Sequence, residues 1–291
     1  MNFGKVITAM VTPFDEDLKV DFKALERLIE HLIRTGTDTL LVTGTTGESP
    51  TLSDEEKLQL FKAAKEIAGN RAKIMAGTGS NSTHHSIELS RKAEKIGVDG
   101  LLLVAPYYNK PTQEGLFRHF SMIAEAVDTP VVIYNVPGRT GVNIEPETLA
   151  RLGELKNIVA VKDAAGNLDM TGKTRVLAPQ LDIYSGDDSL TLPMLALGAK
   201  GVISVASHVA GAEIKQMIES FESGNTKRAM EIHLELFRLF KTLFVITNPI
   251  PVKEAVNMMG IRVGGFRPPL VPADEKVKAS IKEVLTELGK I

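Results

Sequence analysis

Short apolar runs alternate with segments of helical periodicity along most of the chain. Eight such runs are visible: Val6–Val11, Thr39–Val42, Lys73–Ala76, Gly100–Val104, Val131–Tyr134, Ile158–Val161, Asp182–Tyr184 and Gly201–Val205. Most of them are nearly continuous rather than alternating, which is typical of parallel strands whose two faces are both covered by other parts of the protein. They therefore predict a parallel sheet of eight strands.

The segments between these runs predict helices. Ser53 and Glu56 have the spacing of a capping box, so we expect a helix to begin there. Other segments place apolar residues three or four positions apart and end at stop signals, which are a glycine or Thr129-Pro130. Their apolar positions are Phe22, Leu25, Leu28, Ile29, Leu32 and Ile33, then Ile87, Ala93 and Ile96, then Leu116, Phe120, Ile123 and Val127.

Eight strand-and-helix units within residues 1–224 predict an α/β fold, a (β/α)8 TIM barrel. A doubly wound open sheet is the alternative, but it often carries a glycine-rich phosphate loop after its first strand. Here the first run leads into Thr12-Pro13-Phe14, so that loop is missing. The alternation of strand-like and helical segments ends after Gly224, and the following pattern predicts an all-helical C-terminal domain of residues 225–291. Its expected helices are 226–245, 252–259 and 274–288.

Composition narrows the possible functions. The 291 residues include 34 basic and 36 acidic side chains, and the resulting net charge of −2 argues against non-specific nucleic-acid binding. Cysteine is absent, which excludes disulfides, thiolate catalysis and cysteine-bound metals. The sequence shows no signal-peptide pattern and no apolar run near the roughly 20 residues that span a bilayer. We therefore expect a cytoplasmic protein without nucleic-acid or membrane partners.

Polar residues follow several of the predicted strands. In a (β/α)8 barrel the active site is built at the C-terminal strand ends and in the loops that follow them. Five polar segments occupy such positions: Gly44–Glu48, Pro106–Asn109, Tyr134–Gly141, Lys162-Asp163 and Gly186–Asp188. We expect their side chains to meet at one mouth of the barrel.

Lys162 is the most informative of these residues, because it directly follows the apolar run Ile158–Val161. A lysine at this end of a barrel strand would lie in partly dry surroundings, where desolvation lowers its pKa and exposes a nucleophilic amine. Such an amine forms Schiff bases with carbonyl substrates. The alternative is a lysine that reaches solvent or pairs with Asp163.

The other polar residues have a functional and a plain structural interpretation each. Tyr134 either shuttles protons or is a rim tyrosine whose hydroxyl faces water. The turn Gly44–Gly47 either binds a carboxylate or phosphate or is a simple tight turn. Arg139 either binds a carboxylate through paired hydrogen bonds or forms an ordinary salt bridge. The histidines show no metal-binding spacing, and Asp187-Asp188 is expected to have a capping role rather than to bind a cation.

Seven segments together resemble the 4-hydroxy-tetrahydrodipicolinate synthase (dihydrodipicolinate synthase) family, within the N-acetylneuraminate lyase superfamily of class I aldolases. The resemblance covers essentially the whole chain, in order and at the family's spacing. The segments are GTTGESPTL (44–52), AGTG (76–79), PYYNKP (106–111), YNVPGRTG (134–141), VKDAAGN (161–167), SGDD (185–188) and NPIPVK (248–253).

The resemblance implies a reaction and its catalytic residues. Enzymes of this family condense pyruvate with L-aspartate 4-semialdehyde in the diaminopimelate route to lysine, and they require neither a metal nor an organic cofactor. By matching position, Lys162 is the Schiff-base lysine and Tyr134 is the proton donor and acceptor. Thr45 matches the hydroxyl that links Tyr134 to Tyr108.

The resemblance also implies substrate-binding residues and an assembly. Thr46 and Ile203 match the pyruvate pocket, Gly186 matches its wall, and Arg139 matches the group that binds the semialdehyde carboxylate. Family members are typically homotetramers built from two tight dimers, in which the residue at Tyr108 reaches into the site of the neighbouring subunit. We therefore expect a second copy of this chain as its partner.

A further expectation concerns feedback by L-lysine, which many family members bind beside the residue matching Tyr107. Lysine-sensitive members carry there a small residue, two histidines, an asparagine and a glutamate. At the pocket positions this chain has Pro50, Asp54, Lys57, Asn81 and His85, so that only the asparagine and the tyrosine are kept. We expect weak inhibition at most, because the glutamate that would hold the ligand's ammonium group is lost. The alternative is that the aspartate supplies the missing carboxylate.

Three alternatives to this function stay open. One of them, a scaffold protein, would need a large exposed apolar surface. Another pyruvate-dependent aldolase, of the N-acetylneuraminate lyase or keto-sugar-acid type, would share the lysine but would generally lack the counterparts of Arg139 and Tyr108. A barrel that only binds a keto acid would be favoured by the loss of Lys162 or Tyr134, and both are present. One departure from the family is Asp163, where many members have glutamate.

Overall fold

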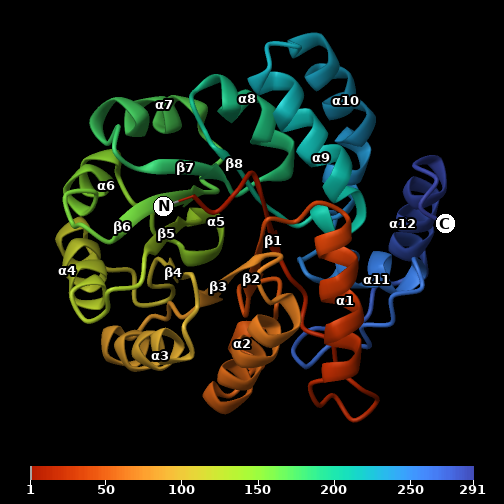
Figure 1. Cartoon of the computed structure of the whole chain (residues 1–291), viewed down its shortest axis with the longest axis horizontal. Helices are drawn as coiled ribbons and strands as arrows, with labels where there is room; N and C mark the ends of the chain where they lie inside the picture. Colours follow the sequence, from red (N-terminus) through yellow and green to blue (C-terminus); the bar gives the residue numbers. More distant parts are fainter. Residues whose placement is uncertain (1) are drawn as a thin grey trace.

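The computed structural model describes residues 2–291 and contains eight parallel strands that close into a barrel in sequence order (Figure 1). The strands β1 to β8 are Val6–Ala9, Thr39–Val42, Lys73–Gly77, Gly100–Val104, Val131–Asn135, Ile158–Asp163, Asp182–Ser185 and Gly201–Ser204. β1 pairs with both β2 and β8, which closes the sheet and excludes the open doubly wound alternative. The predicted (β/α)8 barrel is confirmed.

Six of the eight strands end one or two residues away from the predicted position, and β1 and β6 differ most. The apolar pattern predicts a strand that ends at Val161, but β6 continues through Lys162 and Asp163, because both residues pair with β5 and β7. β1 ends at Ala9 rather than at Val11. Lys162 is therefore held by the sheet itself and not by the loop that follows it.

Both faces of the barrel strands are buried, which explains their continuous apolar runs. Outward-facing residues such as Leu40 and Val42 pack with the surrounding helices in one large cluster. The inward-facing residues form a second cluster that fills the barrel. It includes Ile7, Ala9, Leu41, Met75, Leu102, Val132, Tyr134, Ala160, Tyr184 and Ile203.

A ring of helices surrounds the barrel (Figure 1). The predicted capping box at Ser53 is confirmed, since the Glu56 N–H donates to the Ser53 hydroxyl at 3.2 Å and the Ser53 N–H donates to the Glu56 carboxylate at 2.9 Å. The helices are α1 (Phe22–Arg34), α2 (Asp54–Ala68), α3 (Thr83–Ile96), α4 (Gln113–Ala124), α6 (Pro146–Leu152), α7 (Leu168–Leu177), α8 (Thr191–Ala196) and α9 (Ser207–Glu222). Short helical turns follow three strands: η1 (Ser49–Thr51), α5 (Pro137–Thr140) and η2 (Asp188–Leu190).

Three helices follow α9 on one side of the barrel, as predicted (Figure 1). They are α10 (Thr226–Thr242), α11 (Ile250–Met258) and α12 (Glu275–Glu287). α10 ends at Thr242 rather than at residue 245. Apolar residues of all three, such as Leu236, Val256 and Leu285, join the cluster that covers the outside of the barrel. The division into domains 1–224 and 225–291 stays a prediction from the sequence.

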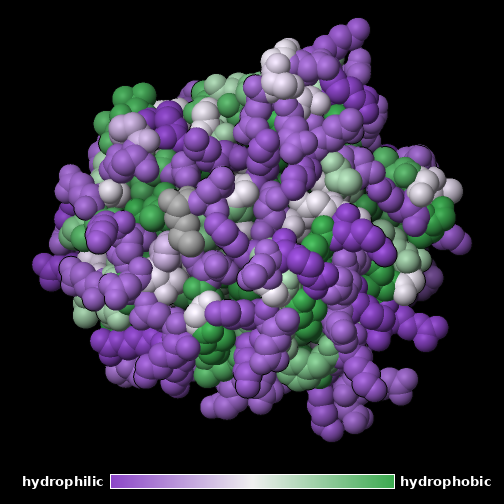
Figure 2. Space-filling model, in the orientation of Figure 1, coloured by the Kyte–Doolittle hydropathy of each residue, from purple (hydrophilic) through white to green (hydrophobic). Residues whose placement is uncertain are grey.

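The surface of the barrel is polar on the face shown in Figure 2, where hydrophobic residues form only small scattered groups. Within residues 2–291, every helix is too short or too polar to cross a bilayer. In the same part of the chain, no three His, Asp or Glu side chains gather in a group that could hold a metal ion.

Candidate active site

Lys162 and Tyr134 lie side by side on adjacent strands near the C-terminal end of the barrel. The sheet register pairs Tyr134 of β5 with Lys162 of β6. The Lys162 Nζ lies 4.2 Å from the centre of the Tyr134 ring. Both residues are buried, each with 6% of its surface exposed. Their mutual position is thus fixed by hydrogen-bonded strands, which are the most rigid support a barrel offers.

Burial makes the Lys162 amine unusually easy to deprotonate. Loss of solvent lowers its pKa to about 7, although the negative charge of Asp188 raises it, and the positive charge of Arg139 lowers it further. Asp163, the alternative ion-pair partner, instead accepts hydrogen bonds from a backbone N–H and from the Thr171 hydroxyl at 2.6 Å. A large fraction of this amine is therefore neutral and nucleophilic near pH 7.

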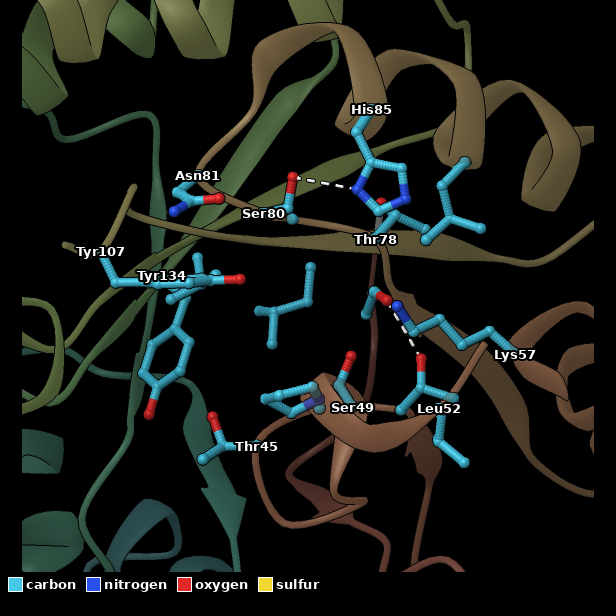
Figure 3. A pocket seen from close by; sticks show the side chains of 18 of the residues that line it. Thr45, Ser49, Leu52, Lys57, Thr78, Ser80, Asn81, His85, Tyr107 and Tyr134 are labelled. Carbon is cyan, nitrogen blue, oxygen red and sulfur yellow. Dashed lines mark hydrogen bonds between the residues drawn. The ribbon is translucent and has the colours of Figure 1, made fainter. Parts of the chain in front are cut away.

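Tyr134 and Thr45 bring two hydroxyl groups together beside this amine. Figure 3 shows the Tyr134 phenol directed toward Thr45, which lies in the loop after β2. Burial raises the pKa of the phenol, while the positive charge of Arg139 and hydrogen bonding to Thr45 oppose the rise. A phenol that stays protonated next to a second hydroxyl is suited to handing protons to a reacting group.

A cavity of about 580 Å³ extends from these residues toward the outside of the barrel. Thr45, Tyr134 and Arg139 line its inner part. The Arg139 guanidinium is exposed at this position, and its Nη2 lies 3.5 Å from the backbone oxygen of Asn248. Among residues 2–291 no carboxylate forms a salt bridge with this arginine, which lines the cavity.

The predicted pyruvate-binding residues lie around the same end of the barrel. Ile203 belongs to the inner cluster together with Tyr134. Gly186 follows β7, and its N–H donates to the Asp163 carbonyl at 2.7 Å. A Cβ at Gly186 would lie 2.7 Å from the Cβ of Ala164, so that only glycine fits there. Gly186 thus permits a close approach between the loops after β6 and β7.

Tyr108 is the one predicted catalytic residue that the chain does not bring to the others. It lies in the loop after β4, is 89% exposed, and adopts a φ of +72°, a left-handed conformation that is uncommon for tyrosine. The cavity lining contains its neighbour Tyr107 instead. Within one chain, therefore, Tyr108 is exposed to solvent and lies outside the lining of the cavity that contains Tyr134 and Thr45.

Two residues near the site were not assigned a functional role from the sequence. Asn248 donates from its Nδ2 to the Thr46 hydroxyl at 2.9 Å, although from the sequence its segment only contributed to the family resemblance. Asp188 is buried and accepts hydrogen bonds from the Ser204 hydroxyl and from the backbone N–H groups of Val205 and Ala206. The expected capping role holds for Asp187, whose side chain caps η2 by accepting from the Ser189 N–H at 2.8 Å. The effect of Asp188 on the Lys162 pKa was missed.

The outer part of the cavity is lined by charged residues of α2 and α3 (Figure 3). The His85 Nε2 lies 2.9 Å from the Asp54 carboxylate, and the Lys57 Nζ lies 3.6 Å from it. Burial raises the pKa of Asp54, but the hydrogen bond from His85 and the charge of Lys57 together hold it below its usual value. Asn81 and Tyr107 line the same part. This carboxylate is thus already engaged by two basic groups.

The sequence profile of the Dihydrodipicolinate synthetase family matches residues 2–288. This chain belongs to that family. Curated proteins named 4-hydroxy-tetrahydrodipicolinate synthase are similar over nearly their whole length. The Desulforamulus reducens protein is 53% identical over 290 residues, which are 99% of this chain and 98% of that protein. The Cyanothece protein is 54% identical over 290 residues, which are 99% of each.

Solved structures of the dihydrodipicolinate synthetase family agree with this assignment. Dihydrodipicolinate synthase DapA-2 from Bacillus anthracis superimposes with a TM-score of 0.96 at 47% identity, covering 98% of both chains. The enzyme from Cyanidioschyzon merolae, whose structure has lysine bound, gives a TM-score of 0.97 at 46% identity, covering 99% of both. The resemblance stated from the sequence is confirmed, and these matches favour the synthase over the alternative aldolases.

Proposed function

We propose that this chain condenses pyruvate with L-aspartate 4-semialdehyde to 4-hydroxy-tetrahydrodipicolinate, in the diaminopimelate route to lysine, through a Schiff base at Lys162. The observation that carries the proposal is the buried amine at the end of β6, whose pKa is lowered to about 7. A neutral amine at neutral pH attacks a ketone directly, whereas an ordinary lysine would be protonated almost completely.

The chemistry begins at the pyruvate ketone. The Lys162 amine adds to it, and loss of water from the resulting carbinolamine gives an iminium ion. Loss of a proton from the pyruvate methyl group gives an enamine, whose carbon attacks the aldehyde of the second substrate. The amino group of that substrate then closes the ring on the imine carbon and releases the lysine. Tyr134 and Thr45 move the protons of these steps, and Tyr108 of a second copy connects them to solvent.

Substrate binding is assigned to the residues around the lysine. Thr46 and Ile203 hold pyruvate, and Gly186 forms the wall beside it. Arg139 binds the carboxylate of the semialdehyde, which is supported by its exposed position in the cavity lining. A planar guanidinium can hold a carboxylate through two parallel hydrogen bonds. In this assignment pyruvate binds inside the barrel and the second substrate binds nearer the mouth.

We further propose a homotetramer built of two tight dimers, working in the cytoplasm. Support for the dimer comes from Tyr108, which is 89% exposed and in a left-handed conformation in the isolated chain. A strained and exposed aromatic residue in a loop beside the site is well placed to enter the site of a neighbouring copy.

Borohydride trapping with pyruvate tests the proposal. We expect one reduced adduct per chain, located by mass spectrometry on Lys162, and none in Lys162→Ala. Lys215→Ala serves as the matched control, because it removes a partly buried lysine at the other end of the barrel. Addition of L-aspartate 4-semialdehyde should consume pyruvate, whereas N-acetylneuraminate should not be cleaved. An adduct on another lysine, or none, would contradict the proposed mechanism.

A further inference from the structure

A buried ion pair joins the C-terminal helices to the loop after β2. The Lys253 Nζ of α11 donates to the Glu48 carboxylate at 2.7 Å, and both side chains are completely buried. The two residues are 205 positions apart in the sequence. Neither of them lines the cavity. The pair therefore has no assigned part in the site.

The surroundings of Lys253 hold its amine in a single position. It also donates to the Gly265 carbonyl at 2.5 Å and lies 4.2 Å and 5.2 Å from the ring centres of Phe14 and Phe266. Burial lowers its pKa to about 8, and the Glu48 carboxylate opposes this fall. Buried ion pairs are often no more stabilising than apolar residues of the same size, so stability alone is a weak reason for this one.

Glu48 connects the fixed Lys253 amine to the loop that carries Thr45 and Thr46. Its backbone adopts a φ of +55°, and its N–H donates to the Thr45 carbonyl at 3.1 Å. The second oxygen of its carboxylate accepts from the Arg267 N–H at 3.1 Å. The Glu48 side chain is thus hydrogen-bonded to the C-terminal segment, and its backbone is hydrogen-bonded to Thr45.

A second contact links the same two parts of the chain. The Asn248 side chain, just before α11, donates to the Thr46 hydroxyl at 2.9 Å. The loop 44–48 is therefore fastened to the C-terminal segment at the hydroxyl of Thr46 and at the carboxylate of Glu48. α11 and α12 themselves lie at the side of the barrel in Figure 1.

We propose that Lys253 and Glu48 are positioning residues, whose ion pair holds the loop 44–48 so that Thr45 and Thr46 face the substrates. The C-terminal helices thereby complete the active site without contributing a reacting atom. A displacement of about 1 Å at a reacting group can cost roughly a hundredfold in rate, so a fixed loop has a direct kinetic consequence. The inference rests on the proposed condensation, in which the two threonines take part.

The test compares Lys253→Met with Lys215→Met. The control variant breaks another lysine–carboxylate pair of 2.7 Å, between Lys215 and Asp38, at the opposite end of the barrel. We expect Lys253→Met to lower kcat for the condensation at least about tenfold and to raise the half-saturating pyruvate concentration. The borohydride adduct should still reach one per chain at saturating pyruvate, because Lys162 is held by β6. A merely structural role would lower adduct and turnover together, in proportion to the unfolded fraction.

Glu48→Gln provides a second variant of nearly the same shape, which keeps the test open if Lys253→Met does not fold. It should likewise lower kcat for the condensation while the borohydride adduct still reaches one per chain. The double variant Glu48→Gln with Lys253→Met should be no slower than the worse single variant, because the two residues act as one unit.

Three results would overturn the inference: turnover like that of Lys215→Met in both single variants, loss of adduct in parallel with turnover, or losses that multiply in the double variant. A wild-type chain without turnover would instead count against the proposed function, since the same assay measures it directly.

Discussion

The reactivity of Lys162 is set by its neighbours more than by its own chemistry. Burial on β6 lowers the pKa of the amine, Asp188 raises it and Arg139 lowers it. Each contribution comes from a different part of the chain, since Asp188 follows β7 and Arg139 follows β5. The balance keeps the amine near neutrality at physiological pH, where a Schiff-base lysine is most useful.

A pH dependence of adduct formation follows from this balance. The neutral amine is the nucleophile, so the rate of pyruvate adduct formation should rise with pH through a midpoint near 7 and then level off. Arg139→Ala should move the midpoint upwards, because the arginine charge lowers this pKa. Samples quenched with borohydride at timed intervals would measure the rate. A midpoint near the ordinary lysine value of about 10.4 would contradict the environment described for Lys162.

Arg139 should affect one substrate and spare the other. Loss of a charged hydrogen bond to the semialdehyde carboxylate costs about 1.5–3 kcal/mol, so Arg139→Ala should lower kcat/KM for the semialdehyde roughly 10- to 150-fold. Pyruvate adduct formation on Lys162 should persist at saturation. Steady-state kinetics with each substrate varied in turn would separate the two effects. Equal losses for both substrates would mean that Arg139 supports the site structurally instead.

At the scale of elements, the helices α2 and α3 decide what the outer part of the cavity can bind. Their first turns bring Asp54, Lys57 and His85 together. The aspartate is held by the two basic groups, at 2.9 Å from His85 and 3.6 Å from Lys57. A cationic ligand entering here would meet the lysine charge and a carboxylate that is already paired.

We therefore expect that millimolar L-lysine does not meaningfully inhibit this protein. The missing carboxylate and the like charge of Lys57 should weaken lysine binding by at least about tenfold to a hundredfold relative to a sensitive enzyme. A steady-state assay with L-lysine titrated to several millimolar would measure it, and Lys57→Gln should increase the sensitivity. The Cyanidioschyzon merolae enzyme, whose structure has lysine bound, is a suitable comparison. Half-inhibition below about 1 mM would show that Asp54 does replace the lost glutamate.

At the scale of the whole molecule, the proposed site is incomplete within one chain. Lys162, Tyr134 and Thr45 come together within the barrel, whereas Tyr108 is 89% exposed on the loop after β4. The proposed second copy would supply this tyrosine. Activity would then depend on the assembly as well as on the fold.

Subunit mixing tests this dependence. Tyr108→Phe alone should lower kcat by roughly a hundredfold or more, within the range for lost acid–base assistance. When Tyr108→Phe chains exchange with Lys162→Ala chains, one site of each mixed dimer regains every group, and part of the activity should return. Size-exclusion chromatography of differently tagged chains would prove the exchange. If proven exchange restores nothing, Tyr108 acts within its own chain.

The sequence alone determined the barrel and most of the residues at its mouth. Continuous apolar runs are required wherever a parallel strand is covered on both faces, so they located β1 to β8 and, with them, Lys162 at a strand end. The capping box at Ser53 could also be predicted, because its two hydrogen bonds join residues only three positions apart. Such local and periodic features can be predicted directly from the order of residues.

The tertiary structure decided what depends on residues that are distant in sequence. The pKa of Lys162 depends on Asp188 beyond the next strand, and the loop of Thr45 is held by Lys253, 205 positions after Glu48. Asn248 reaches Thr46 across 202 positions. No spacing rule predicts such contacts, because they exist only after the barrel has closed and the C-terminal helices have packed against it. Burial and Coulomb interactions act through space, and the fold alone sets those distances.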